Sequence, residues 1–524
     1  MTVLTRDLQA QLTAHADDVM LVSLTDERQY TGQQVTALVE QTKQALADQA
    51  IGAGDVVLIA LANHWLYPIL EQALWEIGAI AHPVAPTSGV REILDEFADY
   101  HYTAGIFAES FRPALATQPD FLDQTFAIHE QPVYFYRYQQ GEALQNGMTL
   151  SDDSLAVILN TSGSTGKPKR VGLTHAQLAN SAHHIAASQR LTNQDATMVV
   201  MPMFHVNAQV IAMLSTRLSG GKLVVAEKFS ASKFWEAVAD HQVTWVSIVP
   251  TIVQMLQQNE RARTAFARCQ ADVQLKYVRS ASFSLPAEQL AAFQDQYGIP
   301  VIEGYGMTEA ASLIALNPFE APKPGTVGLP VATEIALLVE NRVTNVPNQT
   351  GEILLRGDHV ITDYVDPKPR AFHDGWLRTG DLGRFDDDGY LKIVGRIKDI
   401  ISRGGEKVAP AAIEAVLRQL DFVADVVVVG TPDTLYGEAV TAVVIPTKND
   451  LTEAKMTTKL LEYASTQLSQ PARPTQVFFV ADYPRNPTGK VVRRSATTGR
   501  DDRKVGAWQK KRNDLIYMRW ISYD

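Results

Sequence analysis

Cysteine is almost absent from this chain, because Cys269 is the only one in 524 residues. One thiol excludes internal disulfides and a zinc site built from several cysteines, and it fits a reducing compartment. The sequence also has no run of 18 or more apolar residues, which excludes a transmembrane helix and integral membrane association. Residues 1–17 are polar and have no apolar core, unlike a secretory signal. We therefore expect a cytoplasmic protein.

An excess of positive charge is missing as well. The formal net charge is −11 and the pI is about 5.6. The chain as a whole thus has no electrostatic reason to bind nucleic acid or an anionic membrane surface. What it does have is 46% apolar residues, enough for a large core, and a length that predicts more than one structural unit. Composition leaves open whether two copies form a homodimer.

The first 150 residues alternate short apolar runs with helical stretches. Runs at 55–61 and 79–84 flank a helical pattern at 66–77, which is typical of βαβ units with a mostly parallel sheet. The same alternation continues, with further strand-like runs at 198–201, 222–226, 245–249, 276–279 and 301–303. The pattern predicts an α/β fold whose large N-terminal domain consists of layered α/β sheets.

The pattern changes after about residue 333. Short strands separated by Gly, Asp and Asn up to residue 396 predict a small, partly closed β subdomain. A helix at 410–420, strands at 423–430 and 439–446, a helix at 452–468 and a strand at 476–480 predict a small mobile α+β C-terminal domain. We expect domains at 1–397 and 398–498, followed by a tail, 499–524, of unknown role.

Residues 160–170 read Asn-Thr-Ser-Gly-Ser-Thr-Gly-Lys-Pro-Lys-Arg and follow an apolar strand-like run at 155–159. Glycines let a backbone approach an anion closely, hydroxyls donate to phosphate oxygens, and lysines supply charge. The segment is not the P-loop of mononucleotide-binding NTPases, which has four residues between its glycines and Ser or Thr after the lysine. A surface loop of the same composition is the alternative. The candidate phosphate-binding residues are Thr161, Ser162, Gly163, Ser164, Thr165, Gly166 and Lys169.

Residues 303–309 read Glu-Gly-Tyr-Gly-Met-Thr-Glu after another strand-like run. Gly304 and Gly306 would let the turn pass close to a planar ligand, Tyr305 can stack on a base, and Glu309 offers oxygen ligands to magnesium. On local grounds alone, a tight turn capped by Thr308 is an equal alternative.

Six more residues carry charge or are glycine in distinctive contexts. Asp381 lies in a glycine turn and can accept two hydrogen bonds from vicinal hydroxyls. Arg396 and Lys398 follow in Gly-Arg-Ile-Lys-Asp, and the pair Gly404 and Gly405 permits close backbone passage of a thin ligand. Lys490 ends Arg-Asn-Pro-Thr-Gly-Lys. Taken singly, these lysines and arginines would be read as solvated charges.

In this order, the motifs resemble those of the adenylate-forming superfamily, which includes acyl-CoA synthetases, luciferases and the adenylation domains of peptide synthetases. The resemblance extends to about residue 494. It implies that the 160–170 loop binds the ATP phosphates, that Tyr305 covers adenine, and that Thr308 contacts the α-phosphate. By the same resemblance Glu309 binds Mg²⁺, Asp381 and Arg396 bind ribose, and Lys398 is the hinge. Gly404 and Gly405 would line the CoA tunnel, and Lys490 would act with Thr165, Glu309 and His205 in catalysis.

The acyl pocket is less clearly marked. Met201-Pro-Met-Phe-His205 resembles the superfamily's acyl-pocket motif, with His205 near the carboxylate, and Ser280 falls in a second pocket segment. These segments look most like oxalate-CoA ligases, with carnitine- and fatty-acid-CoA ligases also similar. The oxalate type usually has histidines where this chain has Asn207 and Ser312, which puts oxalate in doubt. Arg170 replaces the usual Gly, and we expect it to point to solvent.

The resemblance implies an AMP-forming acyl-CoA synthetase that uses ATP, Mg²⁺ and coenzyme A on a small-molecule carboxylate. The alternatives are an adenylation enzyme that loads a carrier protein and a catalytically silent nucleotide-binding regulator. Intact Glu309, Asp381 and Lys490 speak against the silent regulator, and the glycine pair at 404–405 favours CoA over a carrier protein.

Overall fold

The computed structural model describes residues 1–142, 149–161, 169–282, 285–366, 368, 370–484, 491, 493 and 521–522. The chain divides into two compact units. Unit 1 comprises residues 1–335, 355–377 and 520–524, and unit 2 comprises 336–354 and 378–519. None of the described helices is both long and apolar enough to cross a membrane.

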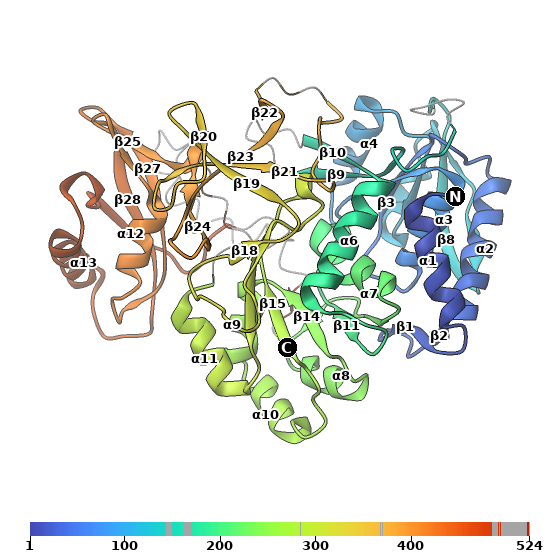
Figure 1. The fold of residues 1–524 in the computed structure, drawn as a ribbon, viewed down its shortest axis with the longest axis horizontal. Helices are drawn as coiled ribbons and strands as arrows, with labels where there is room; N and C mark the ends of the chain where they lie inside the picture. Colours follow the sequence, from blue (N-terminus) through green and yellow to red (C-terminus); the bar gives the residue numbers. More distant parts are fainter. Residues whose placement is uncertain are drawn as a thin grey trace. The chain divides into compact units, whose positions relative to one another are not determined.

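Within the described residues, unit 1 contains a nine-stranded sheet (Figure 1). From β1 through β12, β11, β14 and β15 to β16, neighbouring strands run parallel, and the edges are antiparallel. The predicted strand-like runs fall on these strands, whose residues are almost all buried. The order is β18 (Leu329–Pro330), β17 (Ala315–Leu316), β16 (Val301–Tyr305), β15 (Tyr277–Ser280), β14 (Trp245–Ile248), β11 (Ala196–Val199), β12 (Lys222–Val225), β1 (Val19–Ser23) and β2 (Gln29–Thr31).

A second sheet in unit 1 has eight strands. Its parallel centre carries the βαβ units predicted from the first 150 residues, because β3 pairs with both β4 and β5 in parallel. The antiparallel pair β9 and β10 closes one edge. The order is β10 (Lys169–Thr174), β9 (Leu155–Thr161), β4 (Ile80–Pro83), β3 (Val56–Ala60), β5 (Ala104–Phe107), β8 (Gln131–Tyr138) and β6 (Phe121–Asp123), with β7 (Phe126–Ile128) paired to β8.

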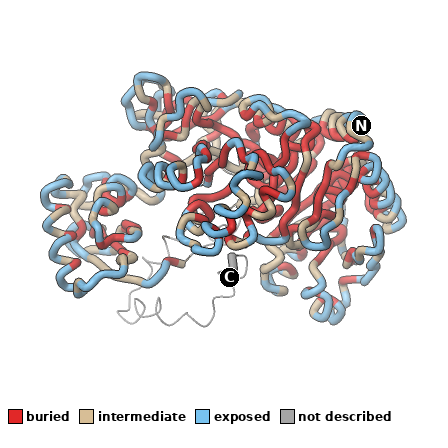
Figure 2. The backbone as a smooth tube through the Cα atoms, turned by 90° about the horizontal axis from the view of Figure 1, so that it is seen from below, coloured by how far each residue is buried: buried red, intermediate tan, exposed pale blue. Residues whose placement is uncertain are grey.

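A layer of helices contacts both sheets. Helices α2 and α7 contact strands of the first sheet, whereas α3 and α6 contact strands of the second. Three helices of the layer begin at a threonine that forms a capping box, namely Thr2, Thr31 and Thr174. Buried residues form the interior of unit 1, where the tube in Figure 2 is mostly red. The layer consists of α1 (Val3–Ala14), α2 (Gly32–Asp48), α3 (Leu66–Ile77), α6 (His175–Gln189) and α7 (Ser215–Leu218).

The remaining elements of unit 1 surround these layers. Helix α11 contacts β16, and α9 contacts both α10 and α11. A short parallel pair, β13 (Phe229–Ser230) with β30 (Ile521–Ser522), ties the end of the tail to unit 1. The other helices are α4 (Val90–Asp99), α5 (Arg112–Leu115), α8 (Phe234–Asp240), α9 (Pro250–Gln258), α10 (Glu260–Cys269), α11 (Ala287–Tyr297), the π-helical η2 (Asn207–Leu214) and the 3₁₀ turns η1 (Glu109–Phe111) and η3 (Thr308–Ala310).

The boundary between the units passes through a six-stranded sheet, which is antiparallel where its pairings are described. Its strand β21 is buried over five consecutive residues, whereas β19 and β23 mix buried with partly exposed residues. The order is β20 (Arg342–Thr344), β19 (Glu334–Val339), β21 (Gly351–Arg356), β23 (Trp376–Phe385) and β22 (Phe372–His373), with β24 (Leu391–Arg396) paired to β23.

Unit 2 also has its own five-stranded sheet with two helices against it. Alternate valines of β27 and β28 pack with Ile413, Leu417 and Leu460 of the helices into a separate core. The α/β class with a large N-terminal and a small C-terminal domain is thus confirmed. The elements are β26 (Glu406–Val408), β25 (Ile401–Arg403), β28 (Gly437–Pro446), β27 (Val423–Asp433), β29 (Gln476–Phe479), α12 (Pro410–Leu417), α13 (Glu453–Gln467) and the 3₁₀ turns η4 (Ile397–Asp399) and η5 (Gln470–Ala472).

Candidate functional site

The candidate phosphate loop connects two antiparallel strands. Strand β9 ends at Thr161, β10 begins at Lys169, and these two residues are register partners. The two ends of the loop are therefore held side by side at the edge of the second sheet. The predicted residues between them, Ser162, Gly163, Ser164, Thr165 and Gly166, lie outside the described residues, as does Lys490.

Arg170, next to the loop, does not point to solvent, so that prediction was wrong. Its guanidinium donates to Glu96 Oε2 at 2.9 Å and lies 4.3 Å from the centre of the Tyr100 ring. Both side chains of the ion pair are largely buried, at 12% and 15% exposure. Burial pushes the pKa of Glu96 up, but the hydrogen bond and charge of Arg170 outweigh it and hold that pKa below its usual value. A planar guanidinium can bond and stack at once, which accounts for its place between an acid and a ring.

Glu309 is linked to the base of the same loop. Its buried carboxylate accepts a 2.9 Å hydrogen bond from the Tyr364 hydroxyl. The ring of Tyr364 in turn lies 5.4 Å from Lys169 Nζ, and its pKa is raised by burial and by the charge of Glu309. The structure therefore brings the predicted metal carboxylate together with the predicted phosphate-binding lysine through a tyrosine.

A close approach requires glycine at position 306 of the 303–309 turn, and space at Gly304 is tight. A Cβ on Gly306 would lie 1.4 Å from the Ser312 carbonyl oxygen, and one on Gly304 would lie 3.0 Å from Arg279 Nη2. Ser312 itself is buried and has a left-handed backbone, with φ of 88°. Tyr305 and Thr308, by contrast, are half-buried. The turn therefore passes directly over Ser312 and Arg279, which connects the nucleotide motif to the predicted acyl pocket.

The predicted pocket residues His205 and Asn207 lie at the start of η2. Asn207 is buried and accepts a 2.9 Å hydrogen bond from Ser247 Oγ on β14. His205 packs against Phe204, with ring centroids 4.1 Å apart, and burial lowers the pKa of His205 to about 4. Its imidazole is therefore neutral near pH 7. Its buried Nε2 has no hydrogen-bond partner among the described residues.

Arg279 of β15 is completely buried beside these residues. Its Nη1 donates weakly to Ser247 Oγ at 3.5 Å, whereas Nε and Nη2 have no partner in the described part of the chain. Burial lowers the pKa of Arg279 only to about 10, so it remains charged. A buried, incompletely bonded guanidinium costs several kcal/mol unless an anion meets it.

Ser280 lies on the other face of β15, because side chains alternate along a strand. Its register partner on β16 is Glu303, which is buried and whose pKa is raised to about 7 by that burial. The structure thus groups Asn207 with Arg279, and places Ser280 with Glu303 instead.

The predicted ribose residues of unit 2 form a pair. Asp381 on β23 and Arg396 on β24 are register partners, and Arg396 Nε lies 2.7 Å from Asp381 Oδ1. Asp381 is 4% exposed and its backbone N–H donates to Thr379 Oγ1. Lys398 lies in η4 directly after this pair.

Gly404 and Gly405 form the two-residue tip of the hairpin between β25 and β26. Their φ angles of 58° and 89° are both left-handed, which only glycine adopts without strain and which such tight hairpins require. Arg403, beside the tip, donates to the Pro471 and Arg473 carbonyl oxygens.

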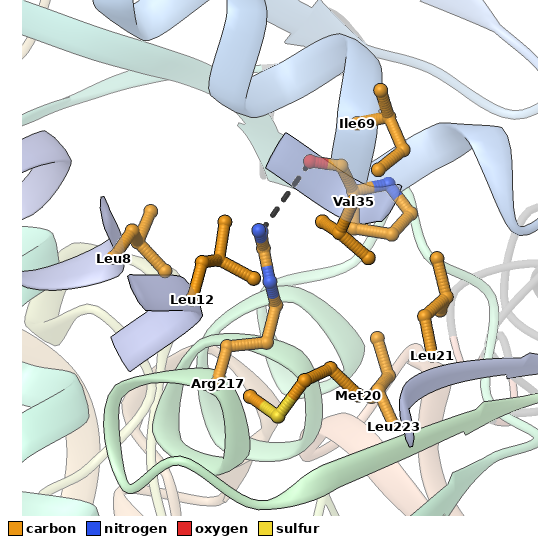
Figure 3. A pocket seen from close by; sticks show the side chains of 9 residues that line it. Leu8, Leu12, Met20, Leu21, Val35, Ile69, Arg217 and Leu223 are labelled. Atoms are coloured by element: carbon orange, nitrogen blue, oxygen red, sulfur yellow. Dashed lines mark hydrogen bonds between the residues drawn. The ribbon is translucent and has the colours of Figure 1, made fainter. Parts of the chain in front are cut away.

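Two cavities of the described residues contain none of the predicted site residues. The first is a small apolar space around Arg217, whose Nη1 donates to the Pro68 carbonyl at 3.3 Å (Figure 3). The second lies between residues 97–102 and 138–142.

Sequence reasoning overlooked three residues of this site. Arg279 lies next to Ser280 in the segment that resembles the acyl pocket, but it was not singled out as a site residue. Tyr364 stands in a segment without a recognisable motif, and Arg170 was noticed only as a substitution for Gly. A buried charge can be recognised only when its burial is known, so composition and spacing could not have identified them.

Comparisons with known proteins identify the family and the fold. The AMP-binding enzyme model matches residues 8–365, and the AMP-binding enzyme C-terminal domain model matches residues 412–490. An oxalate–CoA ligase of Arabidopsis thaliana is 38% identical over 65% of this chain and 67% of that protein. A sulfoacetate–CoA ligase of Cupriavidus necator is 36% identical over 65% and 66%. The structure of O-succinylbenzoate coenzyme A synthetase from Bacillus subtilis with ATP and magnesium is 25% identical, with a TM-score of 0.78, over 93% of this chain and 98% of that one.

Proposed function

Since this chain belongs to the family of AMP-binding enzymes and is an AMP-forming CoA ligase, we propose that it activates a small acid carrying a second anionic group. The ligase uses ATP with Mg²⁺, and coenzyme A is the acceptor. The observation that carries the proposed substrate is the buried guanidinium of Arg279.

Arg279 presents Nε and Nη2 without partners in the described residues, beside Asn207 and under Gly304. An apolar acyl chain at this position would leave the buried charge uncompensated. A second carboxylate or a sulfonate would instead accept two charge-assisted hydrogen bonds from the planar fork. The burial of Arg279 therefore favours a doubly anionic acid over a fatty acid.

Two relatives carry names that agree with this choice, because oxalate and sulfoacetate each have two anionic ends. The sequence put oxalate in doubt because Asn207 and Ser312 replace histidines. Arg279 supplies a permanent cation in the same place, so loss of the histidines need not remove recognition of an anion. Asn207 and Ser312 are shorter than histidine, and we infer that they admit an acid longer than oxalate.

For the nucleotide, we assign the roles implied by the motifs. The loop residues between Thr161 and Lys169 bind the β- and γ-phosphates, Tyr305 and Gly304 face the adenine, and Thr308 contacts the α-phosphate. Asp381 and Arg396 bind the ribose hydroxyls. Gly306 is needed for the turn itself.

Glu309 fits a Mg²⁺ site, because its carboxylate is buried, is held by Tyr364, and offers the hard oxygen that this ion prefers. When bound, Mg²⁺ would neutralise phosphate charge. The substrate carboxylate oxygen attacks the α-phosphorus, the bond to the β-phosphate oxygen breaks, and pyrophosphate leaves. His205, neutral at pH 7, would orient the attacking carboxylate, while Lys490 and Thr165 stabilise the charge that develops between the two anions.

In the second half-reaction the CoA sulfur attacks the acyl carbon, and AMP leaves. We propose that residues 398–498 rotate about Lys398 between the two steps, and that Gly404 and Gly405 then line the CoA tunnel. Lys490→Ala should slow adenylation by about 10²-fold or more and spare thioester formation from supplied acyl-adenylate. Lys398→Pro should permit adenylation but block thioester formation. Equal loss in both half-reactions for either variant contradicts these roles.

The substrate is tested by ATP–pyrophosphate exchange across matched acids, each dicarboxylate or sulfonate paired with a monocarboxylate of the same length. The proposal predicts exchange with the doubly anionic member of a pair and CoA thioester formation when CoA is added. Faster exchange with the monocarboxylates in every pair would refute it. We further propose a cytoplasmic location and a homodimer, which fractionation and sedimentation would test.

A further inference from the structure

Two histidines and an aspartate of unit 1 meet outside the ligase site. His184 lies on α6, and Asp358 and His359 follow β21. His184 Nε2 lies 3.0 Å from Asp358 Oδ1 and 3.2 Å from Oδ2, and His359 Nδ1 lies 3.1 Å from Oδ1. All three ligand atoms lie within 4.8 Å of one another. Nothing in the ligase reaction uses them.

The surroundings of His359 fix its tautomer. Its side chain is completely buried, and its Nε2 lies 3.0 Å from both the Leu313 carbonyl oxygen and Thr333 Oγ1. The carbonyl can only accept, and Thr333 donates its own proton to the Val331 carbonyl at 2.9 Å. Both neighbours therefore accept from Nε2, which must carry the proton.

The other ring nitrogen then faces an acceptor. With the proton on Nε2, the neutral imidazole directs the lone pair of Nδ1 toward the Asp358 carboxylate, 3.1 Å away. Two electron pairs at this distance repel each other unless a cation lies between them. A second proton would make a charged imidazole in a completely buried position, whereas a metal ion would use the lone pair directly.

The donor set and spacing suit a zinc-class ion. Neutral imidazole is the commonest ligand for such ions, and a His₂Asp set leaves a fourth position for water at the exposed Asp358. Ligand atoms about 2.0–2.1 Å from a tetrahedral ion lie about 3.3 Å apart. The nitrogen-to-oxygen distances of 3.0 and 3.1 Å come close to that spacing, and all three ligand atoms lie within 4.8 Å of one another, so an ion would draw the two imidazoles together around the Asp358 carboxylate. Magnesium, by contrast, prefers oxygen ligands throughout.

We propose that His184, Asp358 and His359 form a binding site for Zn²⁺ or a similar divalent transition metal. The ion would brace α6 to the segment that follows β21. That segment supports the ligase site, because the Ile361 N–H donates to the Glu309 carbonyl at 2.9 Å and Tyr364 donates to the Glu309 carboxylate. The site is thus structural: it would steady the segment that holds Glu309, and it contributes no ligand to the proposed magnesium site.

The test uses the full chain without a histidine tag, stripped with chelator and dialysed against buffered zinc. His184→Gln and Asp358→Asn each remove one ligand at a half-exposed or exposed position. His183→Gln is the matched control, because His183 is the next residue of α6 and pairs with Asp7 instead, 3.0 Å away. Elemental analysis gives the zinc content, and thermal unfolding is followed with zinc and with magnesium alone.

We expect about one zinc per chain in the parent and in His183→Gln, with affinity at least about 10²-fold weaker in the two ligand variants. Zinc should raise the unfolding midpoint of the parent by about 3 °C or more and leave those variants unchanged, while magnesium has no such effect at this site. Equal zinc content in all four proteins would place any bound ion elsewhere and overturn the proposal. So would a parent that retains no zinc, since a proton would then occupy the place of the metal.

Discussion

Replacing Arg279 by methionine should change which acids the ligase accepts. The substitution keeps a long side chain but removes the charge and the two donor nitrogens without partners in the described residues, Nε and Nη2. A hydrogen bond to a charged group contributes about 1.5–3 kcal/mol, so two such bonds amount to about 3–6 kcal/mol. At about 1.4 kcal/mol for each factor of ten, kcat/KM for a doubly anionic acid should fall by about 10²–10⁴.

The same variant should not harm folding. Replacing a buried, unpaired charge by an apolar side chain of similar size is often neutral or stabilising. We therefore expect an unchanged or higher thermal midpoint for Arg279→Met. Arg279→Lys is the control for charge, because lysine keeps the positive charge but loses the planar fork, and its activity should fall between the two.

The assay measures initial rates of pyrophosphate release with CoA for a dicarboxylate and for the monocarboxylate of equal length. The ratio of kcat/KM for the dicarboxylate to kcat/KM for the monocarboxylate should fall sharply in Arg279→Met, while the rate with the monocarboxylate is unchanged or higher. If kcat/KM falls by the same factor for both acids, Arg279 supports the fold of the site without recognising the second anionic group, and the reasoning is refuted.

Three other changes probe groups around the site. Tyr364→Phe removes the hydrogen bond to Glu309, so the Mg²⁺ concentration for half-maximal rate should rise about 10-fold; an unchanged magnesium titration contradicts the link. Arg170→Gly leaves the Glu96 carboxylate buried without its ion-pair partner, and should lower the free energy of unfolding by about 3 kcal/mol. The double variant with Glu96→Gln should regain a large part of that stability, as measured by thermal midpoints. Burial raises the pKa of Glu303 from 4.5 to about 7. Protonated Glu303 therefore favours the folded state fully below pH 4.5, and this contribution is lost as the pH rises through about 7. The contribution to the free energy of unfolding is at most about 3 kcal/mol. The midpoint of the parent should therefore fall relative to that of Glu303→Gln between pH 5 and pH 8, and a constant difference between the two would count against this.

The sequence by itself determined the α/β fold and the reaction class. Buried strands such as β11 and β14 are mostly apolar, with one hydroxyl residue each, so local composition predicts where they lie. The Tyr-Gly-Met-Thr-Glu turn and the Gly-Gly hairpin tip need particular residues for backbone reasons, as Gly306 against the Ser312 carbonyl demonstrates. Such backbone requirements can be recognised from a single amino-acid sequence.

Only the tertiary structure decided which charges are buried and what they meet. Arg170 looked like a solvated residue, yet it pairs with Glu96, which lies 74 residues earlier in the chain. Arg279 lies in the segment that resembles the acyl pocket, yet its importance comes from complete burial without a carboxylate partner among the described residues. His184 and His359 are far apart in sequence and meet because α6 packs beside the segment after β21. Burial and long-range contact set the free energy of a charge, and neither is a property of the residues next to it in the chain.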